Sequence, residues 1–248
     1  VEFFGISGSG KTTFKDNIKN TLKEKKIRTY TYKQIIEEYL PYSESNIFNY
    51  FLLRIFFFFR KKSHQSFYLK KTFSSKKVHK ETLFQGLKKK IFRIYEENLD
   101  NIFKKNKNKK FSKITLELIR ESNFSHQNKL IFTRWFKEEI VANYLINKNL
   151  NKIQFIIDSE GFIQRLFIYL YKKKNKKQIA KLYLKHCPMP SILIVMDDKV
   201  IKRKKFSNKE FNMDYKELLK IYKVTLMILK SNKNLKIIFK KNFRFSYL

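Results

Sequence analysis

Cysteine, glycine and proline are scarce in this chain of 248 residues, which contains one Cys, five Gly and three Pro. The single cysteine, Cys187, cannot form an internal disulfide, so a reducing compartment suits the chain. The four histidines are scattered and lack the spacing of metal ligands. No Pro-rich linker or internal repeat divides the sequence, which favours a single domain over residues 1–248.

Acidic residues are also few, with 21 Asp and Glu against 56 Lys and Arg and a formal net charge of +35. Such a charge usually indicates nucleic acid or an anionic membrane as a partner. Here the excess is nearly all lysine and is scattered among many aromatic residues, without a recognisable motif for reading nucleic acid. We therefore do not expect nucleic acid as a partner. The rarer arginines mark positions where a planar group can bind phosphate through two hydrogen bonds.

Long hydrophobic runs are absent too. The most apolar stretch, residues 47–59, contains Asn49 and Arg54 and is shorter than the roughly 20 residues of a membrane span. We interpret it as a buried helix; the alternative is a helix on an anionic membrane surface, with the basic residues 60–62 behind it. The chain opens without a charged leader or cleavable apolar segment, so we expect a cytoplasmic protein.

Strand and helix patterns alternate along the chain. Residues 1–4 form a short apolar run, and Phe14, Ile18 and Leu22 then recur at helical spacing. Further strands are predicted at residues 28–32, 153–157, 192–196 and 235–239, with helices at residues 34–40, 162–170 and 218–229. Five strands alternating with helices predict an α/β fold with a parallel sheet covered on both faces.

The segment between the second and third predicted strands is unusually long. Residues 43–150 contain no convincing strand, whereas Phe84, Leu87, Ile91 and Ile94 keep helical spacing. We predict a long helical insertion within the single domain. Within it, residues 104–110 have the polar composition of a solvated loop, and residues 63–80 are the other candidate for disorder.

A phosphate-binding motif directly follows the first strand. Gly5-Ile-Ser-Gly-Ser-Gly-Lys-Thr12 satisfies the pattern G-x-x-x-x-G-K-S/T between a strand and a helix. The glycines let backbone N–H groups curl around a phosphate at the positive end of the helix dipole. We expect Lys11 to reach the β- and γ-phosphates of ATP and the Thr12 hydroxyl to bind Mg²⁺. The predicted nucleotide site comprises Gly5, Ser7, Gly8, Ser9, Gly10, Lys11, Thr12 and Thr13.

Two acids follow the third predicted strand. Asp158 ends the apolar run in the manner of P-loop proteins, where such an aspartate holds Mg²⁺ directly or through water. Glu160 is close enough to share the site and could position or deprotonate an acceptor hydroxyl. Which of the two is the base stays open. The alternative is a pair of solvated acids in the first turn of a helix, and the upstream phosphate loop favours the functional interpretation.

Three segments resemble the P-loop nucleoside and nucleotide kinases, most closely the thymidylate kinase-like group. They are residues 5–13, Ile156-Ile-Asp-Ser-Glu-Gly-Phe-Ile-Gln-Arg165, and Pro190-Ser-Ile-Leu-Ile-Val-Met-Asp-Asp-Lys-Val-Ile-Lys-Arg203. The resemblance implies the three-layer P-loop NTPase sandwich, ATP and Mg²⁺, and a basic lid after the third segment. It implies catalytic roles for Lys11, Asp158, Glu160, Arg165 and Arg203. The alternative for each arginine is one more cation in a basic chain.

The sequence departs from that group where the acceptor would be recognised. Asp158-Ser-Glu replaces the Asp-Arg-Tyr or Asp-Arg-Ser of thymidylate and deoxynucleoside kinases, and no Arg-Glu-Pro follows the second strand. In such kinases the acceptor lies under the helices between the second and third strands. Within that segment Arg134 could grip an anion and Trp135 could stack on the acceptor; the commoner alternative is a tryptophan half buried in the core.

These observations predict ATP-dependent phosphoryl transfer to a small-molecule acceptor that is nucleoside-, nucleotide- or sugar-like. A nucleic-acid-associated P-loop ATPase and a non-catalytic nucleotide-binding module are the alternatives. A sulfotransferase is disfavoured, because its loop does not need the Lys11-Thr12 pair. A homodimer stays open.

Overall fold

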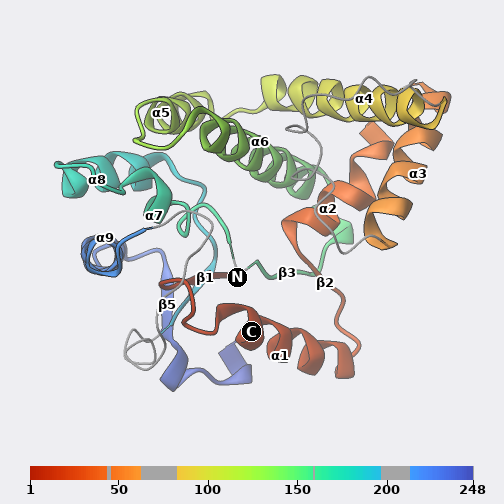
Figure 1. The fold of residues 1–248 in the computed structure, drawn as a ribbon. Coiled ribbons are helices and arrows are strands. Elements are labelled where there is room, and N and C mark those ends of the chain that lie inside the picture. The colour runs from red at the N-terminus through yellow and green to blue at the C-terminus, as the bar shows by residue number, and fades with distance from the viewer. Residues whose placement is uncertain (44–45, 63–82, 159, 197–212, 248) are drawn as a thin grey trace.

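A computed structural model of the chain describes residues 1–43, 46–62, 83–158, 160–196 and 213–247, which form an α/β fold dominated by helices (Figure 1). The strands are β1 (Glu2–Phe4), β2 (Thr29–Tyr30), β3 (Phe155–Ile156), β4 (Ile192–Val195) and β5 (Lys236–Phe239). The helices are α1 (Lys11–Glu24), α2 (Tyr32–Tyr39), α3 (Ile47–Lys62), α4 (Leu83–Lys105), α5 (Lys109–Arg120), α6 (His126–Lys148), α7 (Leu166–Tyr169), α8 (Lys176–His186) and α9 (Tyr215–Lys230).

The strands pair in parallel throughout the described part of the chain. β1, β4 and β5 form a three-stranded sheet in that order, and β2 and β3 form a separate pair. A parallel bridge between Glu2 and Asp158 links the two, and the Phe3 N–H donates to the Asp158 carbonyl at 3.3 Å. The α/β class is confirmed, with helices dominant and a small parallel sheet of three strands.

The second strand is shorter than the predicted 28–32 because a helix cap interrupts it. Thr31 caps α2: its hydroxyl accepts from the Gln34 N–H, and the Gln34 side chain accepts from the Thr31 N–H. This capping box fixes the helix start, so Tyr32 lies in α2. The Thr and Tyr alternation of this segment therefore marks only two residues of strand.

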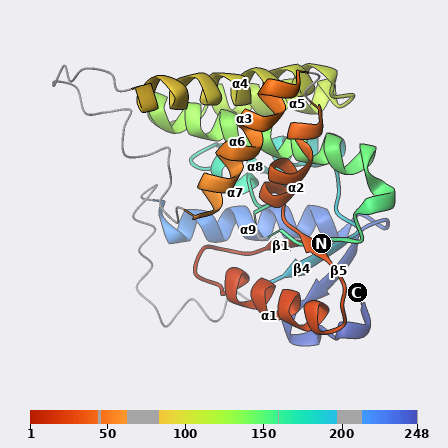
Figure 2. The ribbon, with the colours of Figure 1, turned by 90° about the vertical axis from the view of Figure 1, so that its right-hand side faces the viewer.

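The three-stranded sheet lies between α1 and the helices of the C-terminal half (Figure 2). Phe3, Ile194 and Met196 pack with Ile18 and Leu22 of α1 in one buried cluster. Their neighbours along the same strands belong to the larger cluster with α5 to α9, which includes Phe4, Leu193 and Val195. Successive strand residues point to opposite faces, so β1 and β4 each contribute to both layers.

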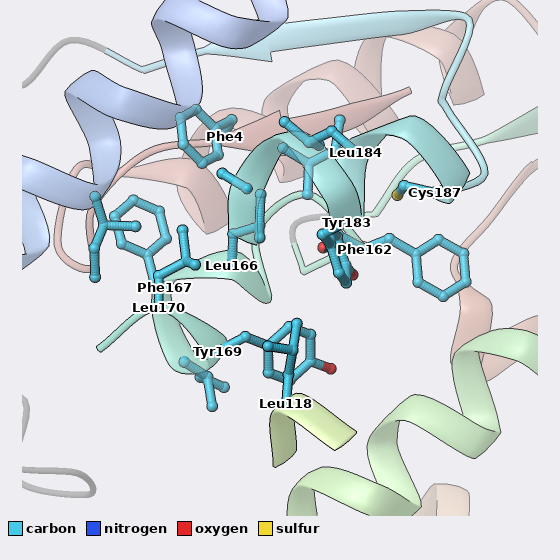
Figure 3. Packing of buried hydrophobic residues seen from close by; sticks show 14 of the residues in the cluster. Phe4, Leu118, Phe162, Leu166, Phe167, Tyr169, Leu170, Tyr183, Leu184 and Cys187 are labelled. Atoms are coloured by element: carbon cyan, nitrogen blue, oxygen red, sulfur yellow. Dashed lines mark hydrogen bonds between the residues drawn. The ribbon is translucent and has the colours of Figure 1, made fainter. Parts of the chain in front are cut away.

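The larger cluster gathers aromatic side chains from β1, from α7 and α8 and from the segment that follows β3 (Figure 3). Phe4, Phe167 and Tyr183 are buried together, and the Tyr183 hydroxyl donates to the Phe162 carbonyl at 2.9 Å. Cys187 is a free, buried thiol of the same cluster, and burial raises its pKa well above the ordinary value. The packing therefore ties α7 and α8 to the sheet.

The helix predicted at residues 162–170 is reduced to the single turn of α7. The preceding residues form turns, and the N–H groups of Phe162 and Ile163 donate to the buried Glu2 carboxylate at 3.1 and 3.4 Å. These bonds hold the segment in a conformation other than a continuous helix. We call residues 160–165 the 160–165 turn.

The insertion between β2 and β3 consists, in its described residues, of helices and the short connections between them. Helix α6 belongs to both major clusters: Phe132, Phe136 and Ile140 pack toward the sheet, whereas Val141 and Leu145 pack against α2, α3 and α4. Helices α4 and α5 extend into the predicted loop at residues 104–110 and leave a short connection. The predicted loop at residues 63–80 lies outside the described residues.

Helix α3 has two apolar faces with different surroundings. Leu52, Leu53, Phe56 and Phe57 are buried against neighbouring helices. Another face exposes apolar side chains to solvent: Ile47, Phe48, Phe51, Ile55 and Phe58. The interpretation as a buried helix therefore holds for one face of α3 only. Among the described residues, no helix combines the length and apolar character that crossing a bilayer requires.

Gly161 offers a test of how closely the turn packs on Glu2. A Cβ at position 161 would lie 1.9 Å from Glu2 Oε1, so we expect Gly161→Ala to destabilise the protein by about 1–3 kcal/mol. Gly86→Ala in α4 is the matched control, because a Cβ there meets nothing within 4 Å. Replacing a glycine inside a helix should raise the free energy of unfolding by about 0.5–1 kcal/mol. Urea unfolding measures both. Wild-type stability of Gly161→Ala would contradict the packing.

Candidate functional site

The glycine loop after β1 takes the backbone conformation that its sequence predicts. Gly8 and Gly10 have φ values of +81° and +84°, in the left-handed region that favours glycine. A Cβ at either position would meet nothing within 4 Å, so their requirement is conformational. At Gly5 the requirement is space, because a Cβ there would lie 2.7 Å from Met196 Cβ.

The loop leads directly into the N-terminus of α1. Gly10 is the N-cap residue and supplies no capping side chain, so the first N–H groups of the helix lack partners of the usual kind. Thr12 and Thr13 are exposed in this first turn, and Ser7 is exposed in the loop. Ser9 is buried beside Gly5. Exposed N–H groups and the positive end of the helix dipole together suit a phosphate.

Lys11 folds back over the loop. Its Nζ donates to the carbonyls of Gly5 at 2.7 Å and Ile6 at 3.1 Å, and the side chain is nearly buried. Burial lowers the Lys11 pKa to about 8, and the nearby charge of Glu160 opposes that shift. The ammonium is thus held mainly by neutral carbonyls, and a phosphate would offer it a negatively charged partner. The residue fits the phosphate of a nucleotide.

The two predicted acids differ in their surroundings. Asp158 accepts from the Tyr32 N–H at 2.8 Å through Oδ2 and from the Glu160 N–H at 3.0 Å through Oδ1. Both of its oxygens are therefore already engaged by backbone donors. The side chain of Glu160 is 62% exposed, and its charge acts on Lys11. The structure thus places Glu160 in the electrostatic surroundings of Lys11.

No group of three or more His, Cys, Asp or Glu side chains that could hold a metal occurs among the described residues. This donor set still fits Mg²⁺ bound with a nucleotide, because Mg²⁺ usually takes one or two protein ligands and completes its shell with phosphate oxygens and water. The Thr12 hydroxyl, exposed in the first turn of α1, is the candidate ligand nearest the loop in sequence.

Arg165 connects the 160–165 turn to α6. Its Nε donates to Glu139 Oε1 at 2.7 Å, and its Nη2 lies 2.6 Å from the same oxygen. Its Nη1 lies 3.5 Å from Glu160 Oε2, and the guanidinium carbon stands 4.7 Å from the ring centre of Trp135. Arg165 and Trp135, predicted separately from sequence, are thus in contact. Arg165 is the N-cap residue of α7 and lies just outside the helix.

Arg134 faces a different part of the molecule from Trp135. Its Nη2 lies 2.8 Å from Glu96 Oε1 and its Nε 3.3 Å from Glu138 Oε1, and its guanidinium stands over the ring of Phe92. Successive helix residues point about 100° apart, so the two side chains do not form one binding site. Arg134 joins α6 to α4. Arg203 lies outside the described residues.

Three residues that sequence reasoning missed complete the surroundings of the turn. Glu139 is an acid on the buried face of α6, where its helical spacing from Phe132 and Phe136 was an available signal. Glu2 is an acid within an apolar strand, and its Oε1 also accepts from the Tyr32 hydroxyl at 3.2 Å. Gln164 binds both backbone groups of Gly5, and nothing in its sequence context indicated this.

Burial controls the ionisation of the two missed acids. It raises the pKa of Glu2 to about 7 and that of Glu139 to about 8, although Arg165 opposes the shift at Glu139. A buried carboxyl group resists ionisation because the charged form loses its hydration. Glu2 and Glu139 therefore keep a proton to a higher pH than ordinary glutamates do.

Comparison of the chain with protein-family models, curated proteins and solved structures gives no match.

Glu139 generates a prediction on pH dependence. Its pKa of about 8 lies above the ordinary value of 4.5, so the folded state binds this proton more tightly than the unfolded state does. The stability that the bound proton contributes is lost as pH rises toward 8. Glu139→Gln removes this titration. We expect the unfolding free energy of the wild type, relative to Glu139→Gln, to fall between about pH 5 and pH 8. Urea unfolding at both pH values measures it, and a constant difference would contradict the assignment.

Proposed function

We propose that the protein transfers the γ-phosphoryl group of ATP, with Mg²⁺, to a small-molecule acceptor that is nucleoside-, nucleotide- or sugar-like. The observation that carries this proposal is the loop between β1 and α1, where two left-handed glycines and an uncapped helix start surround the retracted Lys11. Phosphoryl transfer depends mainly on positioning and charge neutralisation, which such a loop supplies.

We further propose that the five strands act as one sheet in the order β2, β3, β1, β4, β5, within the three-layer sandwich of thymidylate kinase-like proteins. The support is the backbone bonding of β3 on both sides: the Ile157 N–H donates to Tyr30, and the Asp158 N–H to Val1. In open parallel sheets, ligands bind beyond the carboxyl ends of the strands. The glycine loop lies at that end of β1.

On the donor side, the loop N–H groups would hold the phosphates, and the Thr12 hydroxyl would help to hold Mg²⁺, which would supply positive charge against them. Lys11 exchanges its two carbonyl acceptors for phosphate oxygens. Burial has lowered the pKa of Lys11 to about 8, and the exchange gives its ammonium group a negatively charged partner. Asp158, held by two backbone N–H groups, is the carboxylate that can support the metal through water.

On the acceptor side, Glu160 is the base that the geometry favours. It is exposed to an incoming hydroxyl, whereas both oxygens of Asp158 accept backbone hydrogen bonds. Arg165 Nη1 lies 3.5 Å from Glu160 Oε2 and orients this carboxyl group, which would accept the proton of the acceptor hydroxyl. Trp135, in contact with Arg165, is the candidate wall of the acceptor site. Arg134 is engaged with α4, and we leave it out of the site.

Lys11→Ala tests the proposal directly. We expect acceptor-dependent ADP release from Mg-ATP to fall at least about 100-fold, because neutralisation of the transferring phosphoryl group is lost. Lys23→Ala, an exposed lysine in the last turn of α1, is the matched control and should keep wild-type turnover. A panel of nucleosides, nucleoside monophosphates and sugars supplies the acceptors. A fully active Lys11→Ala protein would refute the assignment.

The same assay separates the alternatives. Tight ATP binding without ADP release from any acceptor would indicate a non-catalytic nucleotide-binding module. ATP hydrolysis stimulated by DNA or RNA, with an affinity that falls steeply with salt, would indicate a nucleic-acid-associated ATPase. Either outcome would displace the kinase proposal.

The lowered pKa of Lys11 predicts a pH-dependent affinity for Mg-ATP. Above about pH 8 the free protein loses the ammonium proton, whereas bound phosphate favours the charged form, so binding must then take up a proton. We expect the affinity to weaken between about pH 7 and pH 9, and Lys11→Arg to remove most of this dependence. Isothermal titration in two buffers of different ionisation enthalpy measures the proton uptake. Equal affinity and no uptake at both pH values would contradict the expectation.

A further inference from the structure

Gly5 is the point where β1 loses its neighbour on one side. In a parallel sheet, the backbone groups of successive residues point alternately to the two neighbouring strands. Phe4 bonds to the β4 side, where its carbonyl accepts from Met196 at 2.9 Å, and Phe3 bonds to Asp158 on the β3 side. Gly5 therefore also faces the β3 side. The parallel bridge of Glu2 to Asp158 is the last pairing on this side, and no strand among the described residues pairs with Gly5 there.

The side chain of Gln164 takes the place of the missing strand. The Gly5 N–H donates to Gln164 Oε1 at 3.2 Å, and Gln164 Nε2 donates to the Gly5 carbonyl at 3.0 Å. A primary amide presents a donor and an acceptor side by side, as a backbone peptide does. The first residue of the glycine loop is thereby held in line with β1.

The Gly5 carbonyl accepts from Lys11 as well as from Gln164. When Lys11 leaves for a phosphate, Gln164 remains as a donor to this buried carbonyl. A buried acceptor left without a donor would oppose the exchange, since its desolvation would be uncompensated. Gln164 thus keeps the loop in the same shape with Lys11 retracted or extended.

The neighbouring residue fixes the same turn from the other side. Arg165 is buried against Glu139 of α6, and the N–H groups of Phe162 and Ile163 are bonded to Glu2. The amide of Gln164 therefore projects from a backbone that is anchored at both β1 and α6. An anchored backbone restricts where the amide can go, which is what a positioning role requires.

From these contacts we infer that Gln164 is a positioning residue of the nucleotide loop: its side-chain amide replaces the strand missing beside Gly5 and supports the loop when Lys11 moves to the phosphate. This inference rests on the proposed function, because it concerns the same ATP site. Gln164 acts through Gly5 and Lys11 and takes no part in the chemical step.

Gln164→Met tests the inference, since methionine has a similar length but cannot bond to either Gly5 group. We expect its dissociation constant for Mg-ATP, measured by isothermal titration, to rise about tenfold over the wild type. Gln154→Met is the matched control: Gln154 also accepts from a backbone N–H, that of Arg28 at 3.2 Å, but has no contact with the loop. The control should bind Mg-ATP as the wild type does.

Thermal unfolding without ligand separates positioning from stability. Gln164→Met with a lower melting temperature but wild-type affinity would overturn the inference, as would wild-type behaviour in both measurements. If Gln164→Met fails to fold, Gln164→Glu replaces it: the carboxylate keeps an acceptor for the Gly5 N–H but sets an oxygen against the Gly5 carbonyl, and the same loss of affinity is expected. A wild-type protein that does not bind Mg-ATP would refute the proposed function and the inference with it.

Discussion

The buried carboxylate of Glu2 is the contact on which the candidate site depends. It lies beneath the 160–165 turn and accepts hydrogen bonds from the N–H groups of Phe162 and Ile163. Without these bonds, the two buried N–H groups would have no hydrogen-bond partner. An unsatisfied buried donor costs about 1–3 kcal/mol, so the carboxylate makes a sharp turn feasible where a helix was expected. The absence of a side chain at Gly161 leaves room for that approach.

The turn held in this way sends neighbouring side chains to different elements. Gln164 reaches the glycine loop after β1, Arg165 reaches Glu139 on α6, and Glu160 remains exposed where its charge acts on Lys11. One short segment thus connects the nucleotide loop to the helix that also packs against the insertion. A displacement of this segment would change the surroundings of Lys11 and Trp135 together.

Several of the few acidic residues of the chain lie near the candidate site. Only 21 of the 248 residues are acidic, yet four of them lie around the turn, close enough to affect one another: Glu2, Glu139, Asp158 and Glu160. Among so many lysines, the scarce acids mark the site better than the arginines do. Arg134 is an example, because its guanidinium group forms ion pairs with Glu96 and Glu138 within the helical insertion.

Local patterns in the sequence determined the glycine loop, the start of α1 and the positions of the strands, because left-handed glycines and residue periodicity depend on near neighbours. They also predicted that the insertion is mostly helical, although α4 and α5 extend into the loop expected at residues 104–110. The partners of the turn could not be predicted in this way. Gln164 meets Gly5 across 159 positions of sequence, and Glu2 meets Phe162 across 160. Such pairs form only when strands and helices have packed, so the tertiary structure alone decided which side chains surround the loop.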